Sequence, residues 1–71
     1  MNPINPKKLL HSKWTAVNPT NKAKHFIVSK ITFDEDDAVI SCFIEAVMDK
    51  KPILINWLEL KDDNNWKFGW L

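Results

Sequence analysis

The chain has 71 residues, of which 45% are hydrophobic and 27% charged, and its formal net charge is +1. This length allows one small domain, and the composition excludes a multidomain enzyme, a disordered segment, a membrane span and a strongly basic nucleic-acid binder. The single cysteine, Cys42, excludes an internal disulfide, and no cluster of Cys and His suggests zinc. We therefore expect one domain over residues 1–71, in which residues 1–11 could form a loosely ordered arm.

The first third of the chain predicts a short turn followed by a strand. Asn5 before Pro6 is typical of a helix cap, so one turn is expected over residues 6–10. Residues 12–17 have the alternating pattern of a strand. Residues 18–21, with the sequence Asn-Pro-Thr-Asn, are typical of a turn and are expected to end that strand.

Two β-rich runs in the middle of the chain predict a hairpin. Residues 25–33 and 38–48 are separated by four consecutive acids, which indicate a solvated hairpin tip rather than a calcium loop. The even positions of the second run are all apolar: Ala38, Ile40, Cys42, Ile44, Ala46 and Met48. This period of two predicts a strand with one buried face.

A turn at Glu35 and Asp36 fixes the register that we expect for this hairpin. It places these residues opposite each other: Phe33 and Ala38, Ile31 and Ile40, Ser29 and Cys42, and Ile27 and Ile44. Apolar side chains then meet along most of one face, as a half-buried hairpin requires.

The last third of the chain predicts a strand, a short helical turn and a final strand. Residues 53–55 favour a strand, and Asn56 with Glu59 forms a capping box that predicts a helical or 3₁₀ turn over residues 57–61. The terminal aromatic residues alternate and are expected on one face: Trp66, Phe68 and Trp70. The predicted fold class is therefore mainly β, an antiparallel sheet of four or five strands in a small SH3-like barrel.

Several strings of residues resemble a small tryptophan-rich bacterial family. Ser-Lys-Trp-Thr-Ala-Val occupies residues 12–17, and Trp-x-x-Gly-Trp occupies residues 66–70. Other matching landmarks are Lys8-Leu9-Leu10, Pro19, Lys24-His25-Phe26, Glu45-Ala46-Val47, Pro52-Ile53, Trp57, Leu60 and Asp62. The resemblance covers nearly the whole chain. The resemblance implies a bacterial cytoplasmic protein. Because the function of the family is unknown, the resemblance assigns no catalytic residue.

The small net charge hides a strong asymmetry along the chain. Residues 1–33 contain six Lys and no acid, whereas residues 34–71 contain four Lys and nine acids. A basic segment with aromatic residues is typical of single-strand nucleic-acid binding. The candidate residues for this alternative are Lys13, Trp14, Lys22, Lys24, His25 and Phe26. Against it stand the absence of Arg and a sequence pI of about 7.9, and the two halves could simply neutralise each other.

No group of side chains predicts catalysis, a cofactor or a metal site. His25 is expected to bond a loop at the end of its strand, and His11 is expected to be exposed. Cys42 falls on the apolar face of its strand, which favours a buried, unreactive thiol. The single Gly forbids most phosphate-binding loops, and no catalytic motif occurs. We therefore expect no enzyme, no cofactor and no metal.

Most of the four tryptophans are expected in the core, but all four cannot point inward in so small a domain without crowding. Trp is rarely fully buried and is enriched at interfaces. We expect one or two of the following residues to form an exposed platform: Trp14, Trp57, Trp66 and Trp70. The predicted function is a non-enzymatic interaction module that binds a protein, a peptide or a second copy of itself, with no membrane partner. The alternative is a weak single-stranded nucleic-acid binder.

Overall fold

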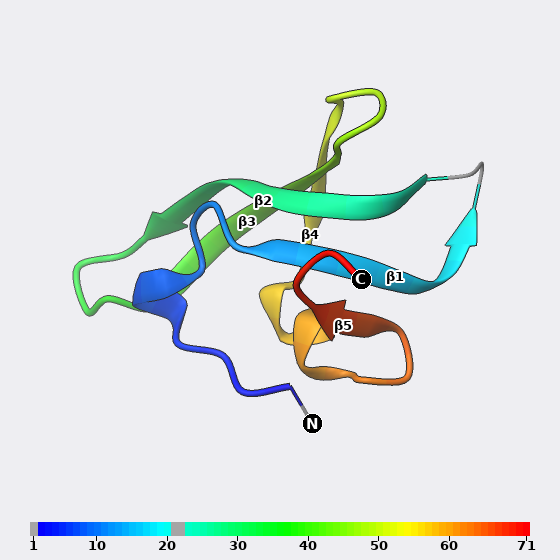
Figure 1. Ribbon diagram of the computed structural model, residues 1–71. Coiled ribbons are helices and arrows are strands. Elements are labelled where there is room, and N and C mark those ends of the chain that lie inside the picture. The colour runs from blue at the N-terminus through cyan, green and yellow to red at the C-terminus, as the bar shows by residue number, and fades with distance from the viewer. Residues whose placement is uncertain (1, 21–22) are drawn as a thin grey trace.

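The computed structural model, which describes residues 2–20 and 23–71, consists of five strands and two 3₁₀ turns (Figure 1). The elements in chain order are η1 (Pro6–Lys8), β1 (Lys13–Thr20), β2 (Ala23–Phe33), β3 (Val39–Ala46), β4 (Pro52–Ile55), η2 (Trp57–Lys61) and β5 (Trp66–Phe68). The predicted mainly β class is confirmed. The predicted turn over residues 57–61 is also confirmed, with Asn56 and Glu59 forming the capping box.

The strands form an antiparallel sheet in the order β4-β3-β2-β1-β5. Strands that follow each other in the chain are neighbours in the sheet, except that β5 returns to pair with β1. Over the described residues β4 and β5 are the two edges, so the sheet is open and closure into an SH3-like barrel is not confirmed. An open sheet retains edges whose backbone groups lack a partner strand.

The hydrophobic core lies on one face of the sheet, which we call the inner face. Four strand residues are buried there: Trp14, Val28, Cys42 and Ile44. Leu60 from η2 and Leu9, directly after η1, pack against them and cover this face. Asn2 anchors the start of the chain, because its backbone N–H donates to Lys61 and its side chain donates to Leu60, both at 2.9 Å. Residues 2–10 are thus packed onto the core rather than held away from it.

The register of the β2–β3 hairpin differs from the prediction. The observed partners are Phe33 and Val39, Ile31 and Cys42, Val28 and Ile44, and Ile27 and Glu45. Two register shifts interrupt the pairing, one between Val28 and Lys30 and one between Thr32 and Phe33. Each shift adds one extra residue to one strand, as a β-bulge does. A turn-based register could not foresee them.

The extra residues of these bulges are Ser29 in β2 and Ile40 in β3. Ser29 therefore does not pair with Cys42, as predicted, and Ile40 is 65% exposed instead of buried. The predicted buried face is correct over residues 42–46, where every even position is buried. It is wrong at Ala38 and Met48, which lie outside the two ends of β3 and are exposed.

β1 is longer than predicted. Residues 18–20 continue the strand instead of starting a turn. The pairing of β1 with β2 is irregular between Thr15 and Thr20, where Pro19 has no N–H to donate. Asn21, the last residue of the predicted turn, lies outside the described residues.

The chain changes direction after β5 at Gly69, whose φ of 85° lies in the region that favours glycine. Before this point Trp66 and Phe68 share the inner face, as predicted. The Trp66 ring meets Phe26 edge-on, with 5.2 Å between the ring centroids, and Phe68 meets Trp14 at the same separation.

Trp70 does not continue this inner-face row, so that part of the prediction is wrong. Its ring lies beside Lys13 and His25. Side chains alternate along a strand, so Lys13 and His25 face away from their chain neighbours Trp14 and Phe26, which pack in the core. Trp70 therefore packs on the opposite face, which we call the outer face. The Trp70 indole N–H fixes this position by donating to the Phe26 carbonyl at 2.9 Å.

Candidate interaction groove

The four tryptophans do not form one platform. Trp14 is 1% exposed and belongs to the core, so it is not a platform residue. Trp66 is half-buried on the inner face, and Trp57 is half-buried where η2 begins. Trp70 is 41% exposed on the outer face. The tryptophans therefore occupy separate places, and only Trp57 borders the groove described below.

The aromatic residues proposed for nucleic-acid binding differ in exposure. Trp14 is fully buried, so its ring has no free face on which a base could stack. Phe26 is half-buried against the core, and its ring is nearly perpendicular to that of Trp66. The structure therefore removes Trp14 from this candidate site and leaves Phe26 partly accessible.

The remaining members of that set are basic or titratable. Lys13 lies on the outer face, with its ammonium 4.8 Å from the centroid of the Trp70 ring. His25 is half-buried there, and its Nε2 bonds the Leu71 carbonyl at 2.9 Å, so its strand-end role is structural. Lys24 is exposed, and Lys22 lies outside the described residues. The aromatic ring beside Lys13 and His25 is that of Trp70, which does not belong to the set predicted for nucleic-acid binding.

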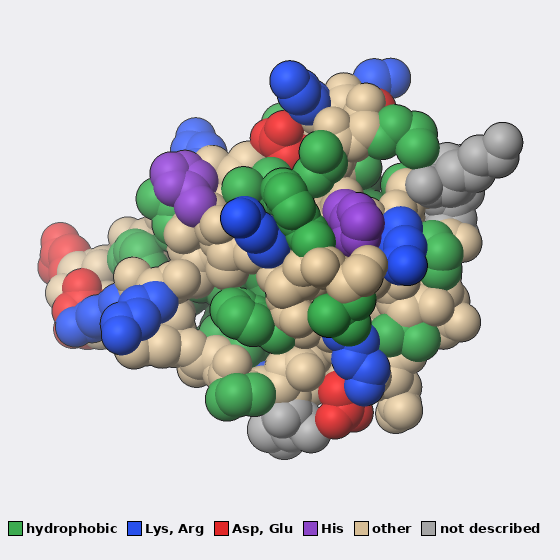
Figure 2. All heavy atoms as spheres, in the orientation of Figure 1, with side chains coloured by type: hydrophobic (Ala, Val, Ile, Leu, Met, Phe, Trp, Pro, Cys, Tyr) green, Lys and Arg blue, Asp and Glu red, His purple; other side chains and the backbone are tan. Residues whose placement is uncertain are grey.

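The acids at residues 34–37 form the exposed tip of the β2–β3 hairpin, as predicted (Figure 2). Asp34 organises this turn, because its Oδ1 accepts from the backbone N–H groups of Asp36 at 2.8 Å and Ala38 at 3.0 Å. Within the described ranges no group of His, Cys, Asp and Glu could hold a metal ion. No helix among the described residues is long and apolar enough to cross a membrane.

Cys42 is fully buried in the core. Burial raises the pKa of the Cys42 thiol above its ordinary value, because a thiolate would lose its hydration there. A nucleophilic thiol needs exposure and a lowered pKa, so this one is unreactive in the folded chain.

We expect a disulfide reagent to label Cys42 slowly in the folded protein and rapidly in urea. The raised pKa also links stability to pH. The contribution of Cys42 to the free energy of unfolding is complete below the ordinary thiol pKa of about 8.5. It is lost as the pH rises from there through the raised pKa of the folded state. The free energy of unfolding, measured in urea, should therefore fall less above this pH in Cys42→Ala. Rapid labelling without urea would contradict the buried thiol.

A gap in strand pairing creates a notch in one edge of the sheet. β2 pairs with β3 from Val39 to Ala46. β4 pairs with β3 only from Cys42 onward, because the chain turns into η2 after Ile55. Residues 39–41 of β3 therefore have β2 on one side and no described strand on the other.

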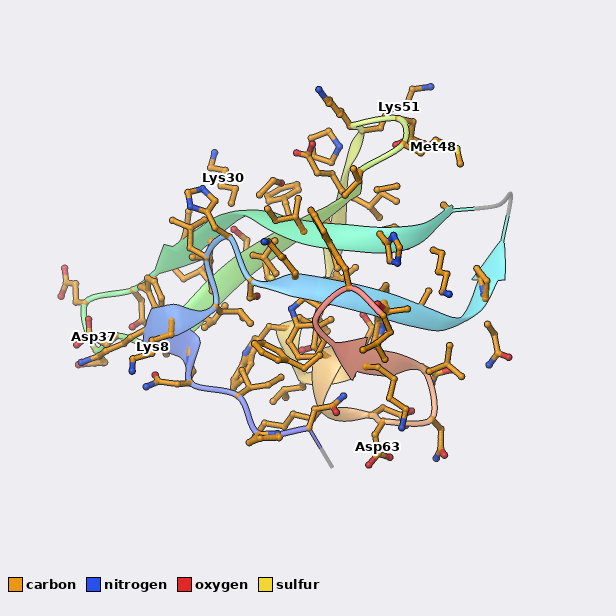
Figure 3. The ribbon with its side chains drawn as sticks, in the orientation of Figure 1. Lys8, Lys30, Asp37, Met48, Lys51 and Asp63 are labelled. Carbon is orange, nitrogen blue, oxygen red and sulfur yellow. The ribbon has the colours of Figure 1, made fainter. Side chains whose placement is uncertain are left out.

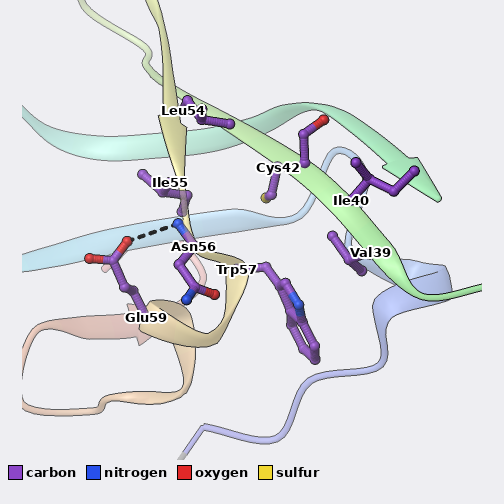
Figure 4. Close-up of a pocket in the computed structure, with 9 residues that line it drawn as sticks. Val39, Ile40, Cys42, Leu54, Ile55, Asn56, Trp57 and Glu59 are labelled. Atoms are coloured by element: carbon purple, nitrogen blue, oxygen red, sulfur yellow. Dashed lines mark hydrogen bonds between the residues drawn. The ribbon is translucent and has the colours of Figure 1, made fainter. Parts of the chain in front are cut away.

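The notch opens onto a groove of about 530 Å³ between β3, β4 and η2 (Figure 4). Its apolar lining residues are Val39, Ile40, Cys42, Leu54, Ile55 and Trp57. Ile40 and Leu54 are 65% and 62% exposed, so large apolar side chains meet solvent here. Asn56 and Glu59 add polar groups, and the Asn56 backbone N–H donates to Glu59 Oε2 at 3.1 Å. The groove thus combines apolar walls with unpaired backbone and a polar end.

Sequence reasoning missed most of this site. The alternating pattern placed Ile40 in the core, and Leu54 received no role. One signal could have revealed the notch, since the run over residues 38–48 is far longer than the run over residues 53–55. A capping box directly after the shorter run shows that its strand must end early. Two paired strands of unequal length leave part of the longer one without a partner.

Comparison with known proteins gives one positive finding. The family model described as "Tryptophan-rich protein (DUF2389)" matches residues 12–71. No curated protein and no solved structure matches the chain. The matched segment contains every residue that lines the groove, and it starts after the packed residues 2–10.

Proposed function

We propose that this chain, which belongs to the DUF2389 family of tryptophan-rich proteins, is a small non-enzymatic interaction module. In this proposal the groove at the notch binds an extended segment of a partner protein or peptide. The observation that carries the proposal is the missing partner strand beside residues 39–41. An extended peptide adds to such an edge as a further strand, held by main-chain hydrogen bonds.

The added segment would lie beside β3 in line with β4. Three residues of a strand span about 10 Å, and their side chains point alternately to opposite faces. On one face the segment would meet Val39 and Trp57, which pack against the core. On the other it would meet the exposed Ile40 and Leu54. Val39 and Trp57 are half-buried, whereas Ile40 and Leu54 meet solvent. The side chains that face Val39 and Trp57, every second one in a suitable segment, are therefore apolar.

A peptide is favoured over a second copy of this chain that pairs through β4. Edge strands avoid such pairing when they are short and carry proline or lysine. β4 has four residues, begins at Pro52 and directly follows Lys50 and Lys51 (Figure 3). Residues 39–41, in contrast, are Val-Ile-Ser and carry neither proline nor lysine. The notch is therefore the better template for an incoming strand.

Peptide selection with the folded protein as bait tests this proposal. Random peptides displayed on phage are enriched on the immobilised chain, and the enriched peptides are then titrated into ¹⁵N-labelled protein. We expect the enriched sequences to alternate apolar residues. We also expect the largest amide shifts, with slowed hydrogen exchange, at residues 39–41. Failure to enrich any peptide, or shifts confined to the outer face around Trp70, would rule out the notch.

A matched pair of surface variants gives a second test. Leu54→Asn changes a groove residue, whereas Met48→Asn changes a residue of nearly equal exposure, 62% against 64%, outside it. Losing apolar contact of about 1 kcal/mol should weaken binding of a selected peptide about fivefold in Leu54→Asn only. Both variants should unfold within about 0.5 kcal/mol of the parent, because they change the surface. Equal binding by the two variants in a fluorescence-anisotropy titration would oppose the proposal.

The proposal includes a bacterial cytoplasmic location and an SH3-like arrangement of the strands. A free cysteine is usual for a reducing compartment, which supports the location. The 3₁₀ turn between β4 and β5 supports the SH3-like description. Imaging of a tagged chain in bacterial cells tests the location, and an experimental structure tests the strand arrangement.

A further inference from the structure

We infer that the segment bound in the groove carries positive charge on both sides of its apolar residues. This inference rests on the proposed function and names the chemistry of its partner. The occupant is an extended peptide with lysine or arginine flanking a short alternating apolar core. Charge complementarity at the two ends of the notch supports this choice.

The groove itself contains one charged side chain, the Glu59 carboxylate. Glu59 lies exposed at the η2 end, and one of its oxygens accepts the Asn56 N–H. At the other end, Asp36 and Asp37 lie three and two residues before Val39, the first residue of β3, at the exposed hairpin tip. Figure 3 shows Asp37 at this tip, well away from Lys51 in the turn that leads to β4. An extended segment in the notch would therefore have carboxylates near both of its ends.

The turn η1 brings Lys7 and Lys8 toward the hairpin tip (Figure 3), two positive charges against the four acids of residues 34–37. Among the described side chains, the ion pair near the notch joins Lys7 to Asp37 at 4.0 Å, and both groups are largely exposed. Such a pair is worth little, so Asp37 can exchange Lys7 for an incoming cation. Lys61 holds its ammonium over the Trp57 ring, 5.3 Å from the centroid, and is the lysine that a basic segment would meet beside the groove.

These charges act mainly on the rate and the salt dependence of association. Exposed charges attract each other over about 8 to 10 Å at ordinary ionic strength, and more salt screens them. Complementary charge at an interface raises the association rate more than the final affinity. Each carboxylate should therefore change peptide affinity by about two- to fivefold at low salt and by less at high salt.

Two synthetic peptides test the inference. Both have the same core of alternating valine and threonine; one has lysines at each end and the other glutamates. Each is labelled with a fluorophore and titrated with the protein at low and high salt, with anisotropy as the readout. The lysine peptide should bind more tightly at low salt, and the difference should shrink as salt rises.

Charge-removing variants locate the effect. Glu59→Gln keeps the capping box, which accepts Gln at this position, and should weaken binding of the lysine peptide about two- to fivefold. Asp36→Asn should act in the same direction. Asp49→Asn, in the turn between β3 and β4, is the control and should change nothing. Lys61→Gln should strengthen binding, whereas Lys67→Gln on β5 should not.

The outcomes separate this inference from the proposed function. If both peptides bind with equal affinity, with amide shifts at residues 39–41, the groove binds peptides and the inference about charge is wrong. If the glutamate peptide binds more tightly, the inference is also wrong. If neither peptide causes shifts at these residues at any salt concentration, and peptide selection fails as well, the proposed function is wrong.

Discussion

Replacing Trp14 with alanine should lower the free energy of unfolding by about 3–5 kcal/mol. Trp14 is 1% exposed, and its ring packs edge-on against Phe68 in the core. Its indole N–H also donates to Ser12 Oγ at 2.8 Å, a bond that the variant loses. A domain of this length has a stability of roughly 4–11 kcal/mol. Trp14→Ala therefore removes a large part of the total, and urea denaturation followed by circular dichroism measures the loss.

Trp70→Ala is the matched control for this variant. Trp70 is partly exposed, and its contacts include a hydrogen bond to Phe26, a cation–π contact with Lys13 and a ring contact with His25. These contacts predict a smaller loss of about 1–2 kcal/mol. If both variants lost the same stability, or if Trp14→Ala unfolded like the parent, the assignment of Trp14 to the core would be wrong. Acrylamide quenching should show the same order, with Trp70 quenched and Trp14 shielded.

The contrast between these two residues shows how far the sequence could predict the fold. The alternating pattern of residues 12–17 implies that Trp14 and Thr15 lie on opposite faces of a strand, and both lie in β1. Alternation alone cannot tell which face is covered, and here both are. Thr15 is buried because its hydroxyl donates to the Gly69 carbonyl and accepts from the Leu71 N–H, at 2.6 and 3.0 Å. Such contacts join residues more than fifty positions apart and leave no local pattern.

Local chemistry was the reliable guide elsewhere. Asn56 and Glu59 predicted a turn that depends on bonds within four residues, and the structure has it. The hairpin register depends instead on two bulges, each of which inserts one residue that no local motif marks. Ile40 is the inserted residue of one bulge and is exposed. The groove follows from this bulge together with the early end of β4, and only the second of these features leaves a signal in the sequence.

Replacing Leu9 with alanine should cost about 2–5 kcal/mol of unfolding free energy. Leu9 is 2% exposed and lies in the core cluster. It also lies outside the matched family segment, which begins at residue 12. The prediction therefore tests whether the packed residues 2–10 are part of the folding unit. It also tests the possibility, raised by the sequence, that they form a loosely ordered arm.

The next residue supplies the control. Leu10 has the same side chain but is 44% exposed, so Leu10→Ala should change stability by no more than about 0.5 kcal/mol. A chain that begins at residue 12 should be at least as unstable as Leu9→Ala, because it also loses the bonds from Asn2 to Lys61 and Leu60. Equal stability of Leu9→Ala and Leu10→Ala in urea would show that the segment is not packed on the core. A loss confined to Leu9→Ala and the shortened chain would make these residues a part of the core that the family match does not include.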